Sequence, residues 1–234
     1  MPGTISFVPF LLLVASLQAS PQAPSAKLVA VSRANLCVTE GAIEELPGGR
    51  LSVTVPKMRA YLNASTPQTI EVRFTYLGST GNEARLGSGE LRRQFGLKLR
   101  AQDACNLVYA MWRIEPESKL FVSVKSNPGQ HNSAECANHG YGNIKPLHSK
   151  PLSALQPGAT HDLRAQMNGE ELKVFADNAL VWEGNVGGAA ASFHGPVGMR
   201  SDNARLELEV RAPQSPALPS NRDPGCRTGP GESE

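Results

Sequence analysis

The sequence of 234 residues lacks an apolar run long enough to cross a bilayer as a helix. Its longest run, from Phe7 to about Leu17, falls short of the ~20 residues that a spanning helix needs, which argues against an integral membrane protein. An excess of one charge is also missing, because 23 Lys and Arg face 21 Asp and Glu and leave a net charge of +2. The chain as a whole therefore offers no strong field for nucleic acid or for an anionic membrane.

Helical periodicity and two catalytic or phosphate-binding motifs are missing as well. No long segment carries apolar residues at helical spacing, and 22 glycines with 18 prolines argue against a helical bundle. No G-x-S-x-G string marks a nucleophile elbow. The Gly-Ser-Gly-Glu at 87–90 is not followed by Lys and Ser or Thr, so it does not predict a phosphate-binding loop. Apolar residues, at 40%, are still enough to form a sizeable core.

The N-terminal apolar run has the length of a secretory h-region and is followed by small residues. Cleavage after Ala19 is predicted, which makes 1–19 a signal peptide and the mature protein secreted or periplasmic. The first residues contain no Lys or Arg, so a buried N-terminal strand stays open as the alternative. Residues 20–26 are predicted to be a linker, 27–211 one domain, and the Pro/Gly-rich 212–234 a disordered tail.

Four cysteines follow the predicted signal peptide, and an even number in an exported chain favours disulfides. A Cys105–Cys136 bond is preferred, because it closes a loop of about thirty residues and is worth ~3–4 kcal/mol on the chain-entropy model. Cys37–Cys226 is the weaker second pair, since Cys226 lies in the predicted tail.

Alternation of apolar and polar residues dominates the predicted domain. Clear examples are LSVTV (51–55), IEVRFTY (70–76) and FGLKLR (95–100), while NLVYAMWRI (106–114) and KLFVSVKSN (119–127) predict a hairpin. About ten to twelve strands with turns at short intervals are typical of a sandwich or a barrel.

The C-terminal third combines strands and turns in a particular order. HDLRAQM (161–167) precedes an Asn-Gly turn, ELKVFAD (171–177) precedes Asn178, and ALVWEG (179–184) is followed by GPVGMRSDNARLELEV (195–210). This stretch resembles the laminin-G-like domains of the concanavalin A-like lectin/glucanase superfamily. The resemblance implies an all-β fold, an antiparallel two-sheet jelly-roll β-sandwich, whose concave sheet often carries a ligand. It implies little about function, because this superfamily includes lectins, glycosidases and adhesive modules.

A hydrolase of the laminarinase type in this superfamily would carry E-x-D-x-x-E or E-x-D-x-E on one strand. Those spacings put two carboxylates on one sheet face, and retaining hydrolysis needs them ~5–5.5 Å apart. The sequence contains neither string. Glu207 and Glu209 share a face, but the leucines between them take the core side and predict that the glutamates are solvated. Carboxylates assembled from distant strands stay open as an alternative.

Metal ligands are weakly indicated. His131, Cys136, His139 and His148 occur close together, but their spacing fits no standard zinc pattern, and Cys136 is expected in the disulfide. Laminin-G-like domains sometimes hold calcium, and Asp177 and Asp202 are the positions to test for it, although Asp-Asn pairs also favour turns. The prediction is therefore no resident cofactor, with calcium as the alternative.

Three predicted strands place cations and aromatic rings on one sheet face. In 95–100, 106–114 and 119–127, alternation sends one set of side chains to the core and the other set outward. If the strands are neighbours, the outward set is a surface for an acidic glycan or another polyanion, with no carboxylate among its cations. The predicted ligand-binding residues are Lys98, Arg100, Tyr109, Arg113, Phe121, Lys125 and Asn127.

Alternatives stay open for this face. Its bases can pair with acids elsewhere on an ordinary solvated surface. The opposite registration of 106–114 would expose Trp112 and Asn106, since both faces of that strand are largely apolar. Trp112 and Trp182 are each a core residue or a sugar platform, and Arg200 with Asp202 forms a structural ion pair or part of a site rim.

The sequence thus predicts a secreted or periplasmic, lectin-like domain that binds carbohydrate without cleaving it. Its partner is a carbohydrate or other polyanionic ligand, and neither nucleic-acid binding nor membrane insertion is expected. A glycoside hydrolase of the same superfamily and a protein-adhesion module are the alternative functions.

Overall fold

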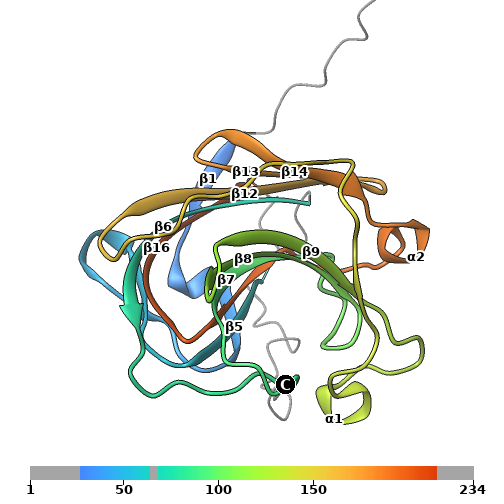
Figure 1. Cartoon of the computed structure of the whole chain (residues 1–234), viewed down its shortest axis with the longest axis horizontal. Helices are drawn as coiled ribbons and strands as arrows, with labels where there is room; N and C mark the ends of the chain where they lie inside the picture. Colours follow the sequence, from blue (N-terminus) through green and yellow to red (C-terminus); the bar gives the residue numbers. More distant parts are fainter. Residues whose placement is uncertain (1–26, 64–67, 215–234) are drawn as a thin grey trace, which may run out of the picture.

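The described residues, 27–63 and 68–214 of this computed structural model, form two β-sheets packed face to face (Figure 1). One sheet has seven strands in the order β10-β9-β8-β7-β15-β5-β2. The other has nine, in the order β11-β14-β13-β12-β6-β16-β4-β3, with β1 pairing with β16. Every pairing within these ranges is antiparallel, and the predicted all-β two-sheet sandwich is confirmed.

The seven-stranded sheet consists of β2 (Leu36–Glu40), β5 (Lys57–Leu62), β7 (Arg93–Leu99), β8 (Leu107–Glu115), β9 (Lys119–Lys125), β10 (Tyr141–Asn143) and β15 (Gly198–Asp202). The nine-stranded sheet consists of β1 (Leu28–Val31), β3 (Glu44–Glu45), β4 (Leu51–Val53), β6 (Thr69–Ser79), β11 (His148–Ser149), β12 (Thr160–Asn168), β13 (Glu171–Ala176), β14 (Ala179–Asn185) and β16 (Ala204–Pro213). The connections contain α1 (Ser133–Cys136), α2 (Gly188–Ala191) and the 3₁₀ turns η1 (Arg33–Asn35) and η2 (Pro47–Gly49).

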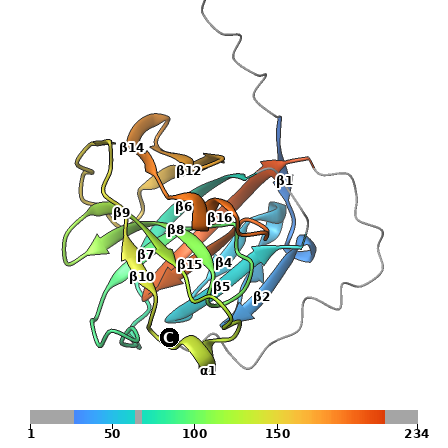
Figure 2. The same cartoon turned by 90° about the vertical axis from the view of Figure 1, so that its right-hand side faces the viewer.

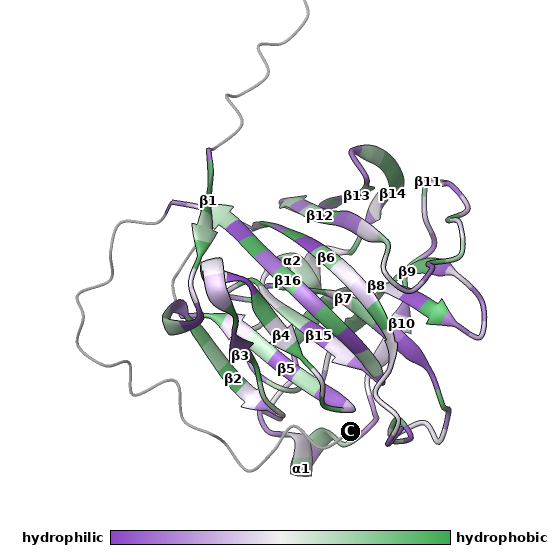
Figure 3. Cartoon of the chain, turned by 90° about the vertical axis from the view of Figure 1, so that its left-hand side faces the viewer, coloured by the Kyte–Doolittle hydropathy of each residue, from purple (hydrophilic) through white to green (hydrophobic). Residues whose placement is uncertain are grey.

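Hydrophilic and hydrophobic residues alternate along strands such as β16 (Figure 3), and the core lies between the sheets because the hydrophobic set is buried there. Phe74 of β6 packs across the interface on Phe95 of β7, with ring centroids 5.0 Å apart, and meets Trp112 of β8 edge-on at 5.7 Å. Trp182 of β14 is equally buried. Both tryptophans are therefore core residues, and the registration that would expose Trp112 is not adopted.

Tight turns join the strands of the C-terminal third as the sequence predicts. Asp177 and Asn178 have φ angles of 50° and 64° between β13 and β14, the left-handed conformation that a two-residue hairpin turn of this kind needs. Gly169, with a φ of 57°, begins the turn between β12 and β13. These turns hold β12, β13 and β14 side by side in the nine-stranded sheet.

The described residues include the predicted domain, apart from 64–67, but not the predicted signal peptide or most of the predicted tail. Strand β16 reaches Pro213, beyond the predicted domain end at 211. The predicted signal peptide (1–19) and Cys226, with the remainder of the predicted tail from 215, lie outside the described residues. No helix within 27–63 and 68–214 is long and apolar enough to cross a membrane.

Candidate functional site

The seven-stranded sheet is curved, and we call its side turned away from the core the concave face (Figures 1 and 2). A pocket of about 210 Å³ lies on it. Its floor is formed by outward side chains of β7, β8, β9 and β15, namely Gln94, Tyr109, Met111, Phe121, Ser123 and Arg200. One wall comes from the β6–β7 connection, through Leu86, Ser88, Glu90 and Arg92. The other wall comes from α1 to β10, through Asn138, Tyr141 and Asn143.

The registration of β8 decides which side chains reach the pocket. Val108, Ala110 and Trp112 enter the core, so Tyr109 and Met111 alternate onto the concave face. Gly96 of β7 lies opposite Met111 of β8. A Cβ atom added at Gly96 would come within 2.5 Å of the Met111 sulfur. Glycine at this position therefore allows Met111 to lie against the pocket floor.

A buried ionic cluster lies beneath the pocket. Asp202 is fully buried, and its Oδ1 accepts a hydrogen bond from Nη2 of Arg59 in β5 at 2.7 Å. Its Oδ2 accepts from Nε of Arg200 at 2.9 Å and from Nε2 of Gln94 at 2.7 Å. Arg59 also donates to the carbonyl oxygen of Ser201, so five residues of three neighbouring strands form one network.

Charge attraction decides the ionisation of this cluster. Burial opposes the charge on Asp202, but the guanidinium groups of Arg200 and Arg59 outweigh burial and hold the pKa of its carboxyl well below the usual range. Burial likewise opposes the charge on Arg200, and Asp202 raises the pKa of that guanidinium. Asp202 is therefore an ionised acceptor at any ordinary pH.

Arginine and aromatic side chains stack within the pocket. The guanidinium carbon of Arg92 lies 5.8 Å from the ring centre of Phe121, and that of Arg200 lies 5.2 Å from the ring centre of Tyr109. Arg92 also pairs with Glu90 at 2.5 Å, and this hydrogen bond lowers the pKa of the Glu90 carboxyl. The two guanidinium groups of the lining are thus each paired with a carboxylate.

Two polar atoms of lining residues, Oε1 of Gln94 and Oη of Tyr141, are buried and have no hydrogen-bond partner within the described parts of the chain. Gln94 is 3% exposed, while the Tyr141 ring stacks on Tyr109 with centroids 6.1 Å apart. Buried polar groups are almost always paired in native proteins. These two atoms therefore leave hydrogen-bonding capacity at the floor and at one wall of the pocket.

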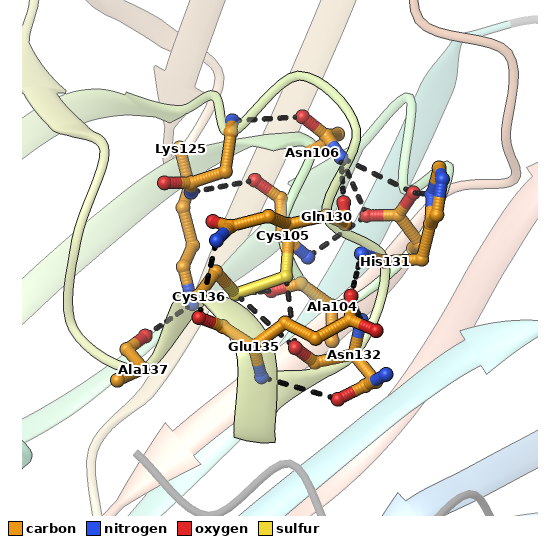
Figure 4. The surroundings of a disulfide bond; sticks show 12 residues. Ala104, Cys105, Asn106, Lys125, Gln130, His131, Asn132, Glu135, Cys136 and Ala137 are labelled. Atoms are coloured by element: carbon orange, nitrogen blue, oxygen red, sulfur yellow. Dashed lines mark hydrogen bonds and ion pairs between the residues drawn. A yellow bond between two sulfur atoms is a disulfide. The ribbon is translucent and has the colours of Figure 1, made fainter.

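The disulfide Cys105–Cys136 is present, as predicted, with Cα atoms 5.9 Å apart (Figure 4). It joins the start of β8 to α1, immediately before the wall residue Asn138. The surrounding contacts are polar: Asn106 donates to the carbonyl oxygen of Gln130 at 2.8 Å. The disulfide therefore fixes one wall of the pocket relative to its floor.

The seven predicted ligand-binding residues do not all meet in the pocket. Tyr109 and Phe121 line it, whereas the other five do not. Lys98 and Lys125 are only 1% exposed, and Lys125 donates to the carbonyl oxygen of Ala137 at 2.9 Å. Asn127 is buried and donates to the carbonyl oxygens of Cys105 and His139.

The two remaining cations are also engaged. Arg113 pairs with Glu117 at 2.9 Å, and Arg100 donates to the carbonyl oxygen of Phe193 at 3.0 Å. Lys98 and Lys125 are thus buried where the sequence suggests exposed cations, and the carboxylates of Asp202 and Glu90 lie on the same side of the sheet. Alternation predicts which way a side chain points but not whether a partner covers it. The roles of these five residues in ligand binding stay predictions.

The candidate metal ligands are held by other contacts. Asp177 accepts a hydrogen bond from the backbone N–H of Asp162 and lies 2.8 Å from Nδ1 of His161, while His131 pairs with Asp103 at 2.9 Å. Both calcium candidates, Asp177 and Asp202, thus already have donors on their oxygens. Within the described part of the chain, no three His, Cys, Asp or Glu side chains gather as a metal site.

No protein-family model matches the chain, and no curated protein sequence is significantly similar to it. Solved structures resemble its fold. The carbohydrate binding module CBM66 of Bacillus subtilis matches 74% of this chain and 91% of its own, with a TM-score of 0.51 and 15% identity. The Emp46p carbohydrate recognition domain matches 76% and 87%, at TM-score 0.47 and 13% identity. LamAcat of Zobellia galactanivorans matches 72% of this chain and 79% of its own, with a TM-score of 0.45 and 14% identity. The first match confirms the expected concanavalin A-like jelly-roll fold and, at this identity, the fold alone.

Proposed function

We propose that this chain is a non-catalytic carbohydrate-binding domain and that the pocket on the concave face holds the sugar. The observation that carries the proposal is the lining itself: it combines the rings of Tyr109, Phe121 and Tyr141 with two buried polar atoms, Oε1 of Gln94 and Oη of Tyr141, that have no hydrogen-bond partner among the described residues. Sugar rings combine apolar faces with hydroxyl groups, and pockets that bind such ligands combine apolar area with a few placed polar groups. The fold shared with a carbohydrate binding module agrees with this proposal without deciding it.

A neutral glycan fits this pocket better than the acidic glycan that the sequence suggests. None of the four predicted cations lines the pocket. The two guanidinium groups that do, those of Arg92 and Arg200, are each paired with a carboxylate. Asp202 is shared with Arg59, but Arg59 also lies 3.7 Å from Glu40, so the charge of these guanidinium groups is largely balanced before any ligand arrives.

The two alternative functions have less support. Glycoside hydrolysis of the usual kind needs two carboxylates that flank the bond, and Glu90 is the one carboxylate that lines the pocket. An adhesive partner on the same open face would need an apolar patch, whereas the lining there includes the charged side chains of Glu90, Arg92 and Arg200. A secreted or periplasmic location, which the disulfide favours, is part of the proposal.

A glycan array at low and at high salt tests this function. The chain beginning at Ser20, the predicted mature form, is expected to bind neutral glycans with an affinity that salt does not change, because screening weakens only charge attraction. Binding only to uronic or sulfated glycans, lost at high salt, would restore the acidic ligand. Silence toward every glycan, or release of reducing ends from those bound, would contradict the proposal.

A further inference from the structure

Gln94 has one hydrogen-bonding end engaged and the other end unpaired. It lies in β7 on the pocket floor, and its Nε2 donates to Oδ2 of Asp202 at 2.7 Å. Its Oε1 is buried without a partner among the described residues. An unpaired buried carbonyl oxygen is costly, so a ligand group that donates to it gains affinity.

Asp202 determines the orientation of the Gln94 side-chain amide. An ionised carboxylate can only accept hydrogen bonds, and Asp202 is kept ionised by Arg59 and Arg200. An amide turned the other way would place two acceptor oxygens against each other at hydrogen-bond distance. The oxygen of Gln94 is therefore the end left for a pocket ligand.

We propose that Gln94, held in this orientation by Asp202, selects for a sugar hydroxyl that donates a hydrogen bond to its Oε1. This inference rests on the proposed function and names the ligand more closely. The pocket takes a neutral sugar and rejects the matching uronic acid where the carboxylate would face Oε1, because two acceptors would then meet without a proton between them. Oη of Tyr141 can donate or accept, so it does not discriminate in this way.

Asp202 is accordingly a positioning residue. It does not line the pocket, and it acts on the ligand through the two lining residues that it holds, Gln94 and Arg200. The chain offers a matched control in Gln166, a half-buried glutamine of β12 whose side chain lies on the outward side of the nine-stranded sheet.

The test is calorimetric titration with the methyl glycosides of glucose, galactose and mannose, with their 2-, 3-, 4- and 6-deoxy analogues, and with the three matching uronic acids. For the tightest neutral glycoside, removal of one particular hydroxyl is expected to weaken binding to the unchanged protein by about tenfold or more. Where that hydroxyl is the one at position 6, the matching uronic acid is expected to bind at least about tenfold more weakly than the neutral sugar. In Gln94→Met the hydroxyl no longer has its acceptor, so the same deoxy analogue is expected to lose less than about threefold.

Two further variants complete the comparison. Gln166→Met is expected to keep the affinities of the unchanged protein. In Asp202→Asn, the new side-chain amide can donate to Oε1 of Gln94, so discrimination against the deoxy analogue is expected to fall as it does in Gln94→Met. Should either Gln94→Met or Asp202→Asn fail to fold, the other of these two variants decides.

The outcomes separate the inference from the function on which it rests. If Gln94→Met binds every analogue more weakly by one common factor and discriminates as before, the role of Gln94 is only structural and the inference is overturned. Where the deoxy analogues identify the hydroxyl at position 6, equal or tighter binding of the uronic acid overturns it as well. If neither neutral nor acidic sugars bind and the array is silent, the proposed function fails together with it.

Discussion

The two outward faces of the sandwich both carry arginines, acids and an arginine stacked on a phenylalanine, yet their charges lie in different surroundings. On the nine-stranded sheet, Arg73 and Asp162 pair at 3.4 Å with side chains 49% and 24% exposed. On the concave face, Asp202 is fully buried and hydrogen-bonded to Arg59, which is buried as well. The same alternation of polar and apolar residues therefore produces a solvated surface in one sheet and a buried ionic cluster beneath a pocket in the other.

Burial determines what each ion pair contributes. An exposed pair contributes about 0–1 kcal/mol, because water already solvates both partners. A buried pair gains little as a pair, but removing one partner strands the other charge and costs about 3–5 kcal/mol. The concave face is thus held rigidly around its pocket, whereas the outward face of the nine-stranded sheet tolerates change.

The largest difference is expected between Asp202→Ala and Asp162→Ala. Loss of Asp202 leaves the guanidinium groups of Arg59 and Arg200 buried without their carboxylate, so the free energy of unfolding should fall by about 3–5 kcal/mol. Loss of Asp162 removes an exposed pair and should change it by less than about 0.5 kcal/mol. Urea unfolding at pH 7 measures both, and equal effects would show that the two faces do not differ in the proposed way.

The dependence of stability on acidic pH tests the same buried cluster. The pKa of Asp202 in the folded chain is lowered, so its contribution to stability is complete above the unfolded value of about 3.9 and is lost as the pH falls below it. Asp202→Asn lacks this contribution and should lose stability less steeply than the unchanged protein between about pH 4 and pH 2. Parallel curves would contradict the ionised state of Asp202.

The next largest effect is expected from the disulfide that positions one pocket wall. Replacing both Cys105 and Cys136 with serine removes the constraint on a loop with a sequence separation of 31 residues and should cost about 3–4 kcal/mol under oxidising conditions. Measuring both proteins with and without a reductant provides the control, because reduction should bring the unchanged protein close to the variant. A stability that is the same for both oxidised proteins would show that this bond does not hold the fold.

For the central strands, the sequence predicted which side chains enter the core and which point outward, because a strand with one buried face alternates apolar and polar residues. Phe95 and Leu97 are core residues as expected, and Tyr109 and Phe121 reach the concave face. Strand β5 was missed, although KMRAYL alternates in the same way and places Met58, Ala60 and Leu62 in the core. With that strand, Arg59 would have been assigned to the same face as the predicted cations.

The pocket itself could not be predicted from alternation. Arg59 and Asp202 lie 143 residues apart, and Gln94 and Asp202 lie 108 apart, so their contacts depend on sheet order rather than on local pattern. The wall residue Arg92 lies in the connection between β6 and β7, and Tyr141 begins the three-residue strand β10. Neither belongs to a stretch long enough to show an alternating pattern. A cation on the outward side of a strand was therefore taken as available to a ligand, although the fold can supply a distant partner, as the carbonyl oxygen of Phe193 does for Arg100.

A final comparison uses two similar stacks on the two faces. The Arg92 guanidinium lies over Phe121 in the pocket, and that of Arg164 lies over Phe175 on the outward side of β13, at 4.4 Å. Both rings are half-buried, so Phe121→Ala and Phe175→Ala should lower the free energy of unfolding to a similar degree. Only Phe121 lines the pocket, and its loss should weaken binding of the tightest neutral glycan on the array by about tenfold, since aromatic contacts contribute on the order of 1 kcal/mol each. If Phe175→Ala weakened binding as much, the sugar would lie on the nine-stranded sheet instead, and the buried charge beneath the concave face would serve stability alone.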